Sequence, residues 1–493
     1  MEKDLITLFA PLFSPRGVLV AGVSSHPGKF GYVTLHNILS SGYAGEVHGT
    51  NKEGGEVLGI SLFKSVVDIP AEAVIDLVFA CTPAASNEQL LRDCAKRGIK
   101  AAFLTSAGYG EAGDEGGKAE RQLVDLADEL EILLAGPNGQ GLVSTPIKLC
   151  AQIVAPNPPS GAIAIVSQSG NFVSSFENFS LAAQVGVSRA ISAGNAASLS
   201  VSDYLDYYSI DPETRVSLAY VEGVPNGRDF YQRARQVTAQ KPLVVLKGGV
   251  TDNGQRAAQS HTGALAQDDR IFRGMARQAG IAQAFSVEEA FDVSAAFATQ
   301  PLPRGPRVMI LTVVGGWGVV TADAMSDSDL VLAEIPKDLE KLIDKKLPAR
   351  WSRNNPIDCA GGETRDTIPE IMAIIADHPE VDAVLYLGIG IQSNQAKMFR
   401  TGPWGNDPDV TRIIAYHERQ DARFALAAAE ISDQTDKPIL VATELSLTDP
   451  TNAGVKAVKD SGRYCFPSGP RAVVALNHLW RYSQYRKKSN RTN

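Results

Sequence analysis

The chain has 493 residues, 44% of them hydrophobic and 21% charged, as in a globular protein of two to four domains. A formal net charge of −8 argues against nucleic acid or an anionic membrane as the main partner, because both need a basic face. Residues 1–11 lack the apolar core of a signal peptide, and the longest apolar runs, such as 73–81, are too short to span a membrane. The five cysteines form no CxxC pair and no metal-ligand cluster, which predicts reduced thiols in a cytoplasmic protein.

Short β-branched runs alternate with longer amphipathic segments, a pattern typical of βαβ units and parallel sheets. The first block ends near residue 155. Its expected strands are 17–24, 45–51, 75–83, 100–108 and 131–138. Residues 116–131 have one charged and one apolar face, which predicts a helix. The prolines of 155–161 then predict a linker.

Two further blocks continue the pattern. The expected strands of the second are 162–168, 187–194, 215–223, 242–249 and 281–285. The third starts after a second linker, 300–307, and its first strand, glycine turn and helix repeat the plan that opens the second block. Its later strands are expected at 381–389, 437–445 and 463–468. We expect little regular structure over 392–412 and a frayed tail over 485–493.

The first candidate site is the glycine turn after strand 17–24. A strand that runs through a glycine turn into a helix can bind phosphate at the helix N-terminus. Gly22, Gly28 and Gly31 are spaced more widely than the dinucleotide fingerprint requires. The next strand ends near Lys52, where an NAD site would need an acidic residue, so a nucleotide with an extra phosphate, such as CoA, is favoured. The alternative is a plain βα turn without a ligand.

The second candidate site lies where strand 162–168 becomes a helix. Ser167, Ser169 and Gly170 stand at this junction. Backbone N–H groups and hydroxyls there would face an anion, and the helix dipole would favour its charge. Ordinary helix capping by Ser169 explains the same residues equally well.

The third candidate site is the long polar segment 247–269, which contains His261. Loops of this length in compact domains are usually functional or disordered. The neighbours of the histidine offer donors for an anion: Ser260, Thr262 and Gly263. An imidazole beside an anion can act as base or nucleophile, and Glu222, at the end of a strand of the same sheet, could hold its other ring nitrogen. The alternatives are a solvated loop histidine and an exposed strand-end charge.

A fourth glycine turn lies at 313–320. A ligand could approach its backbone, and Trp317 would either stack on that ligand or pack against the protein. Downstream, Asn355 and Asp358 are interpreted as capping residues.

A series of motifs now indicates a family. They are residues 22–32, 49–59, 81–84, 105–113, 136–141, 165–172, 220–224, 246–249, 260–266 and 354–358. Their order resembles that in the NDP-forming acyl-CoA synthetases. Over about residues 10–480, the chain is similar to their CoA-ligase part, equivalent to the α subunit of ADP-forming acetyl-CoA synthetase and, more distantly, to succinyl-CoA synthetase α.

The resemblance implies an α/β protein with three domains: a Rossmann-like CoA-binding domain over 1–155 and two flavodoxin-like doubly wound domains over 160–300 and 305–485. His261 matches the phosphohistidine and Glu222 the carboxylate that orients it. Ser167, Ser169 and Gly170 match the phosphate-binding helix start, together with Ser260, Thr262 and Gly263 around the histidine. The implied CoA contacts are Gly22, Ser24, Pro27, Gly28, Lys29, Lys52, Thr82 and Pro83.

The implied reaction interconverts an acid, CoA and ATP with acyl-CoA, ADP and phosphate, through an acyl phosphate and a phosphohistidine. The chain has no ATP-grasp segment, so a separate β subunit is expected to supply the ATP/ADP and Mg²⁺ site, in an α2β2 assembly. Alternatives are a related acyl- or carbamoyl-transfer subunit without nucleotide synthesis and a CoA-sensing regulatory protein. The chain departs from the family motifs at Glu53, in place of lysine, over residues 136–141, where "GPNGQG" replaces "GPNCLG", and at Trp317, in place of proline.

Overall fold

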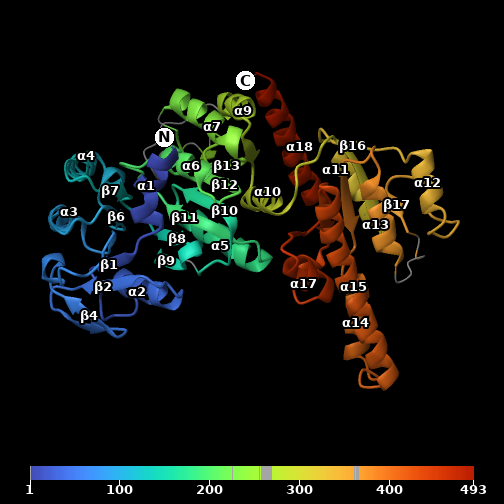
Figure 1. The fold of residues 1–493 in the computed structure, drawn as a ribbon, viewed down its shortest axis with the longest axis horizontal. Coiled ribbons are helices and arrows are strands. Elements are labelled where there is room, and N and C mark those ends of the chain that lie inside the picture. Colours follow the sequence, from blue (N-terminus) through green and yellow to red (C-terminus); the bar gives the residue numbers. More distant parts are fainter. Residues whose placement is uncertain are drawn as a thin grey trace. The chain divides into compact units, whose positions relative to one another are not determined.

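The computed structural model describes residues 2–154, 156–224, 226–251, 253–254, 256, 269–359, 361 and 366–492. The chain forms two compact units (Figure 1). The first consists of residues 1–182 and 186–290, and the second of residues 183–185 and 291–493. The first unit contains two sheets and the second contains one.

The first sheet has seven strands in the order β3-β4-β2-β1-β5-β6-β7, and only β3 runs antiparallel to its neighbour. The strands are β1 (Gly17–Ala21), β2 (Glu46–Thr50), β3 (Gly55–Val57), β4 (Ile60–Phe63), β5 (Leu77–Ala80), β6 (Ala101–Leu104) and β7 (Leu133–Ala135). The helices are α1 (Glu2–Phe13), α2 (Phe30–Ser40), α3 (Asn87–Lys96) and α4 (Asp114–Glu129). The chain order reverses at β1, which lies between β2 and β5. Ligands of open α/β sheets bind at the carboxyl ends of strands at such a switch point.

The second sheet has the order β14-β13-β12-β10-β11-β8-β9. Its strands are β8 (Gly141–Ser144), β9 (Leu149–Gln152), β10 (Ser160–Ser167), β11 (Val187–Ser192), β12 (Val216–Val221), β13 (Leu243–Lys247) and β14 (Ala282–Ala284). Its helices are α5 (Gly170–Ala183), α6 (Val201–Ile210), α7 (Gly227–Gln240) and α9 (Asp269–Gln278). The strands β8 and β9 precede residue 155, where we place the end of the first block, yet β8 pairs antiparallel with β11. The second sheet therefore includes residues that precede that boundary.

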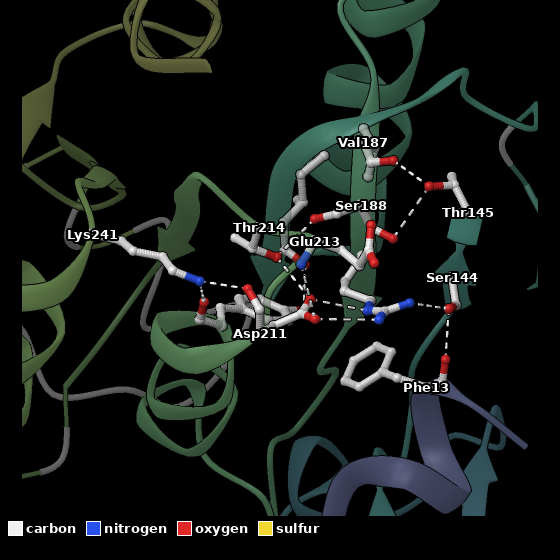
Figure 2. Close-up of polar contacts among 12 residues, drawn as sticks. Phe13, Ser144, Thr145, Val187, Ser188, Asp211, Glu213, Thr214 and Lys241 are labelled. Atoms are coloured by element: carbon white, nitrogen blue, oxygen red, sulfur yellow. Dashed lines mark hydrogen bonds and ion pairs between the residues drawn. The ribbon is translucent and has the colours of Figure 1, made fainter. Parts of the chain in front are cut away.

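A buried polar network ties α1 to the second sheet (Figure 2). The Nε and Nη2 atoms of Arg189 donate to the carboxylate of Asp211, at 3.1 and 3.3 Å. Its Nη1 atom donates to Ser144 Oγ, which itself donates to the carbonyl oxygen of Phe13 at 2.6 Å. An ion pair that is buried and fully hydrogen-bonded fixes geometry, because removing one partner would leave an uncompensated charge. The network thus holds the end of α1 against β8 and β11.

The sheet of the second unit is parallel, with the order β16-β15-β18-β19-β20, and β17 also pairs with β15. The strands are β15 (Arg307–Thr312), β16 (Val331–Leu332), β17 (Ile357–Asp358), β18 (Ala383–Leu387), β19 (Ile439–Ala442) and β20 (Cys465–Phe466). The helices are α10 (Val287–Thr299), α11 (Gly315–Met325), α12 (Lys337–Ile343), α13 (Thr367–Asp377), α14 (Ile391–Thr401), α15 (Pro408–Thr435), α16 (Leu445–Thr448), α17 (Ala453–Asp460) and α18 (Gly469–Thr492).

Two expectations about irregular structure are wrong. Residues 392–412 lie mostly in α14 and the start of α15, which pack along each other (Figure 1). Their apolar side chains Met398 and Trp404 are 69% and 74% exposed, so this segment lacks the buried stripe by which sequence reasoning finds helices. The tail is also helical, since α18 extends through Thr492.

None of the helices in the described ranges combines the length and apolarity needed to cross a bilayer.

Candidate functional site

The turn after β1 forms the predicted glycine turn at the switch point. Gly22 has a φ of +85°, a conformation that favours glycine. The N–H groups of Gly22 and Val23 both donate to the carbonyl oxygen of Thr50, at 3.1 and 2.9 Å, which fixes the turn to the end of β2. A β-carbon at Gly22 would lie 3.1 Å from Thr82 Cγ2, so the ends of β1 and β5 meet here. The structure thus brings together two of the predicted CoA contacts.

The polar residues that follow form an exposed loop. The hydroxyl of Ser24 accepts a hydrogen bond from the His26 N–H at 3.1 Å, and the N–H of Gly28 donates to His26 Nδ1, also at 3.1 Å. His26 was absent from the predicted site, although it lies inside the motif and shapes the loop. Lys29 lies in this loop and Lys52 in the loop after β2; both are exposed. Because β1 and β2 are neighbours, both ammonium groups belong to one edge of the sheet.

A buried hydrogen-bond network supports the end of β5. The Thr82 hydroxyl donates to Asn87 Oδ1 at 3.0 Å. The amide nitrogen of Asn87 donates to Ser106 Oγ at 2.7 Å and to the Tyr109 hydroxyl at 2.8 Å. Asn87 is completely buried, so the network stiffens the edge where Thr82 and the exposed Pro83 lie. Asn87 is not among the predicted site residues, because a polar residue at a helix start resembles an ordinary cap.

The second candidate site is a tight turn from β10 into α5. The buried hydroxyl of Ser167 accepts from the Ser169 N–H at 3.0 Å and donates to the Ser169 carbonyl oxygen at 2.6 Å. The helix begins at Gly170, where a β-carbon would lie 2.2 Å from Cδ of Gln140. Ser167, rather than Ser169, thus supplies the hydroxyl that shapes the turn. The carboxamide of Gln140, which is not among the predicted site residues, packs on the first turn of α5.

Glu222 lies beside this turn. Ser167 is in register with Tyr220 across β10 and β12. The Tyr220 hydroxyl donates to Glu222 Oε1 at 3.3 Å, and Gln168 Oε1 accepts from the Glu222 N–H at 2.6 Å. Burial and the nearby carboxylate raise the pKa of Tyr220 above its ordinary value, so its phenol stays protonated and donates. The Tyr220 ring stacks on Phe172 of α5 with 4.0 Å between centroids.

The predicted phosphohistidine lies outside the described residues, as do the three residues grouped with it. These are His261, Ser260, Thr262 and Gly263. The segment that contains them leaves the sheet at Gly248, directly after β13. A β-carbon at Gly248 would lie 2.6 Å from the Tyr220 hydroxyl and 3.6 Å from Glu222 Cγ. The segment therefore departs from the edge at which Glu222 lies, while a contact between Glu222 and His261 stays a prediction.

The base of that segment carries a buried cation. Lys247, the last residue of β13, is 4% exposed, and its ammonium group donates to the carbonyl oxygen of Gly248 at 3.1 Å. Burial lowers the pKa of Lys247, and the carboxylate of Asp269, at the start of α9, opposes that effect. Positive charge therefore lies at the carboxyl edge of the sheet where the segment begins.

Three family models match the chain in order. A CoA binding domain matches residues 16–144. A succinyl-CoA ligase like flavodoxin domain matches residues 160–297. A Ligase-CoA domain matches residues 308–391. The predicted fold class, a Rossmann-like domain with flavodoxin-like ligase domains, is thereby confirmed.

Known proteins resemble the chain over most of its length. The α subunit of acetate–CoA ligase [ADP-forming] I from Pyrococcus furiosus is 32% identical over 97% of this chain and 98% of its own. The α subunit of isoenzyme II from the same organism is 34% identical over 76% of this chain and 80% of its own. A solved structure of acetyl-coenzyme A synthetase 1 from Ca. Korarchaeum cryptofilum, in complex with phosphate and ADP, superposes with a TM-score of 0.82 at 30% identity, covering 98% of each chain.

Proposed function

The chain belongs to the NDP-forming acyl-CoA synthetase family of acid–thiol ligases, and we propose that it is the α subunit of such an enzyme. The proposed reaction interconverts a carboxylic acid, CoA and ATP with acyl-CoA, ADP and phosphate. One observation carries the proposal: the α5 turn and Glu222 lie at the edge of the sheet from which the segment with His261 departs.

The proposed chemistry passes a phosphoryl group through His261. In the synthetic direction, a phosphoryl group from ATP is transferred to an imidazole nitrogen of His261, and ADP leaves. A carboxylate oxygen of the acid then attacks the phosphorus, the N–P bond breaks and an acyl phosphate forms. Finally the CoA sulfur attacks the acyl carbon, and phosphate leaves with the bonding electrons. A covalent intermediate divides one difficult transfer into two easier steps.

The first turn of α5 is the proposed site of the phosphoryl group. Free N–H groups and the helix dipole stabilise negative charge at a helix start without solvent reorganisation. The turn that Ser167 closes supports this role, because its hydrogen bonds to Ser169 fix the backbone at the helix start. Glu222, held by Tyr220 and Gln168, is proposed to orient the imidazole, as outer-shell acceptors do for functional histidines.

The proposed CoA site is the switch-point edge of the first sheet. The exposed Lys29 and Lys52 flank it and would pair with phosphate groups of CoA. The glycine turn at Gly22, between the ends of β2 and β5, lets a ligand approach the backbone. The other proposed contacts are Ser24, Pro27, Gly28, Thr82 and Pro83.

The nucleotide site is proposed to belong to a separate ATP-grasp β subunit, in an α2β2 assembly. The support is that two relatives, which are covered over 98% and 80% of their own length, are named α subunits. Mg²⁺ on that subunit would neutralise the charge of the nucleotide phosphates. A cytoplasmic location is part of the proposal and rests on the five cysteines, which are free thiols.

The test is acyl-CoA formation by the chain purified together with an ATP-grasp partner. With Mg-ATP, CoA and a panel of carboxylic acids, we expect acyl-CoA and ADP in equal amounts. The His261→Ala variant should lose this turnover but still bind CoA, because its CoA edge is intact. Normal turnover by that variant would exclude the phosphohistidine route, and absence of acyl-CoA from wild type with every acid would exclude the proposed function.

A further inference from the structure

The carboxamide of Gln140 is built into the first turn of α5. A β-carbon on Gly170 would lie 2.2 Å from Gln140 Cδ, 2.3 Å from Cγ and 2.5 Å from Oε1. The whole end of the Gln140 side chain therefore rests on the backbone at the helix start.

Gln140 is held in place by its own backbone. Its N–H donates to Ser192 Oγ at 3.0 Å, and its carbonyl oxygen accepts from the Ile153 N–H at 3.0 Å. The Nε2 atom donates to Asn171 Oδ1, the next residue of α5, at 3.4 Å. These contacts direct the carboxamide nitrogen toward Asn171. The carboxamide oxygen is the remaining polar atom of the side chain.

The Gln140 oxygen is buried, and no donor among the described residues forms a hydrogen bond to it. A buried acceptor without a donor costs about 1–3 kcal/mol, so a ligand that donates a hydrogen bond there gains affinity. A fully ionised phosphate offers no such donor. The acyl group of an acyl phosphate begins one bridging oxygen from the phosphorus, and its first carbons would therefore pass this amide.

We propose that Gln140 is a specificity-determining residue that selects acids with a hydrogen-bond donor, such as a hydroxyl group, close to the carboxyl group. The inference rests on the proposed function, because it places an acyl phosphate at α5. The donor pairs with Gln140 Oε1, whereas an acid without a donor leaves that oxygen buried and unpaired. Sites built to bind a substrate hydroxyl discriminate strongly against analogues that lack it.

The experiment compares acids that differ by one hydroxyl. The complex with the ATP-grasp partner is assayed for kcat/KM with butanoate and with 2-, 3- and 4-hydroxybutanoate. We expect at least one hydroxy acid to exceed butanoate by about tenfold, the effect of one hydrogen bond. Gln140→Leu, which has no acceptor, should reduce that ratio to about twofold or less.

Two further variants keep the test decisive. Gln140→Met gives a second apolar replacement if the leucine variant fails to fold. Gln89→Leu removes an exposed glutamine of α3 and should retain the wild-type ratio. A wild-type preference for butanoate, or a ratio that survives both apolar variants, overturns the role of Gln140 while acyl-CoA formation upholds the proposed function. Absence of acyl-CoA with all acids overturns both.

Discussion

In both units, a hydroxyl at the end of a strand closes the turn into the next helix. Ser167 does so between β10 and α5. Thr312 does so between β15 and α11, where its hydroxyl accepts from the Val314 N–H and donates to the Val314 carbonyl oxygen, both at 2.9 Å. The repeat seen in the sequence thus extends to individual hydrogen bonds.

The two helix starts differ in the group that lies against them. A neutral carboxamide, from Gln140, lies against Gly170 of α5. A carboxylate lies against α11, because a β-carbon at Gly315 would be 2.6 Å from Asp358 Oδ2. Since a helix start favours a negative charge, α11 has an anion from its own chain, whereas the described residue that lies against the start of α5 is the neutral Gln140. This contrast supports an external anion at α5 and not at α11.

The largest effect is expected from making the α5 turn resemble the α11 turn. Gln140→Glu keeps the side-chain length and puts a carboxylate against the first turn of α5. Repulsion of the phosphoryl group should slow acyl-CoA formation about 100-fold, or roughly 3 kcal/mol in the barrier. Steady-state kinetics of the complex, compared with Gln140→Leu, separates charge from packing. A Glu variant as active as the Leu variant would show that no anion binds there.

The helix α5 also contains a carboxyl group, that of Glu177, which is fully buried. Burial raises its pKa to about 8. A raised pKa in the folded state means stability that is complete below the unfolded value, near 4.5, and is lost as the pH rises through 8. Between pH 6 and 8, Glu177→Gln should therefore gain roughly 2 to 3 kcal/mol of unfolding free energy relative to wild type.

Denaturant unfolding at several pH values checks this, with the exposed Glu129→Gln of α4 as control. Parallel pH profiles for wild type and Glu177→Gln would mean that the carboxyl is not held neutral in the fold.

A smaller effect is expected at Tyr220, whose hydroxyl donates to Glu222. Tyr220→Phe removes only that hydroxyl and keeps the ring on Phe172. Loss of an outer-shell hydrogen bond typically costs 10–100-fold, and we expect about tenfold in the rate of His261 phosphorylation. The KM for CoA should stay the same, since the CoA edge belongs to the other sheet. A change in that KM with an unchanged rate would contradict the positioning role.

The smallest effect is expected at α11. Asp358→Asn removes the carboxylate from the helix start and should lower the unfolding free energy by about 0.5–1 kcal/mol. Phosphorylation of His261 should change by less than about twofold, because in this account α11 binds no phosphoryl group. Thermal unfolding and the phosphorylation rate measure the two effects. A large loss of phosphorylation in a stable variant would assign α11 to the reaction.

Much of the fold could be predicted because buried parallel strands appear in the sequence as β-branched runs between amphipathic helices. Strands β8 and β9 could not be assigned to their sheet in this way, because their pairing with β11 is a long-range contact. The helices α14 and α15 were missed because large apolar side chains on them face solvent.

Site residues could be predicted where their position in the local sequence, at the end of a strand, already indicates their role. Ser167 and Glu222 stand at strand ends, and the structure brings these ends together. Gln140 and Asn87 act through packing between distant segments, which one sequence does not reveal. Tyr220 could have been found, because residues two apart on a strand point to the same face, and it precedes Glu222 by two.

Intact-protein mass spectrometry shows whether His261 carries the phosphoryl group. The chain is co-purified with its ATP-grasp partner, treated with Mg-ATP and weighed. We expect a gain of one phosphoryl group that is labile in acid, stable in base and absent from His261→Ala. No gain by the wild-type chain with CoA still bound, or the same gain by the alanine variant, would contradict it.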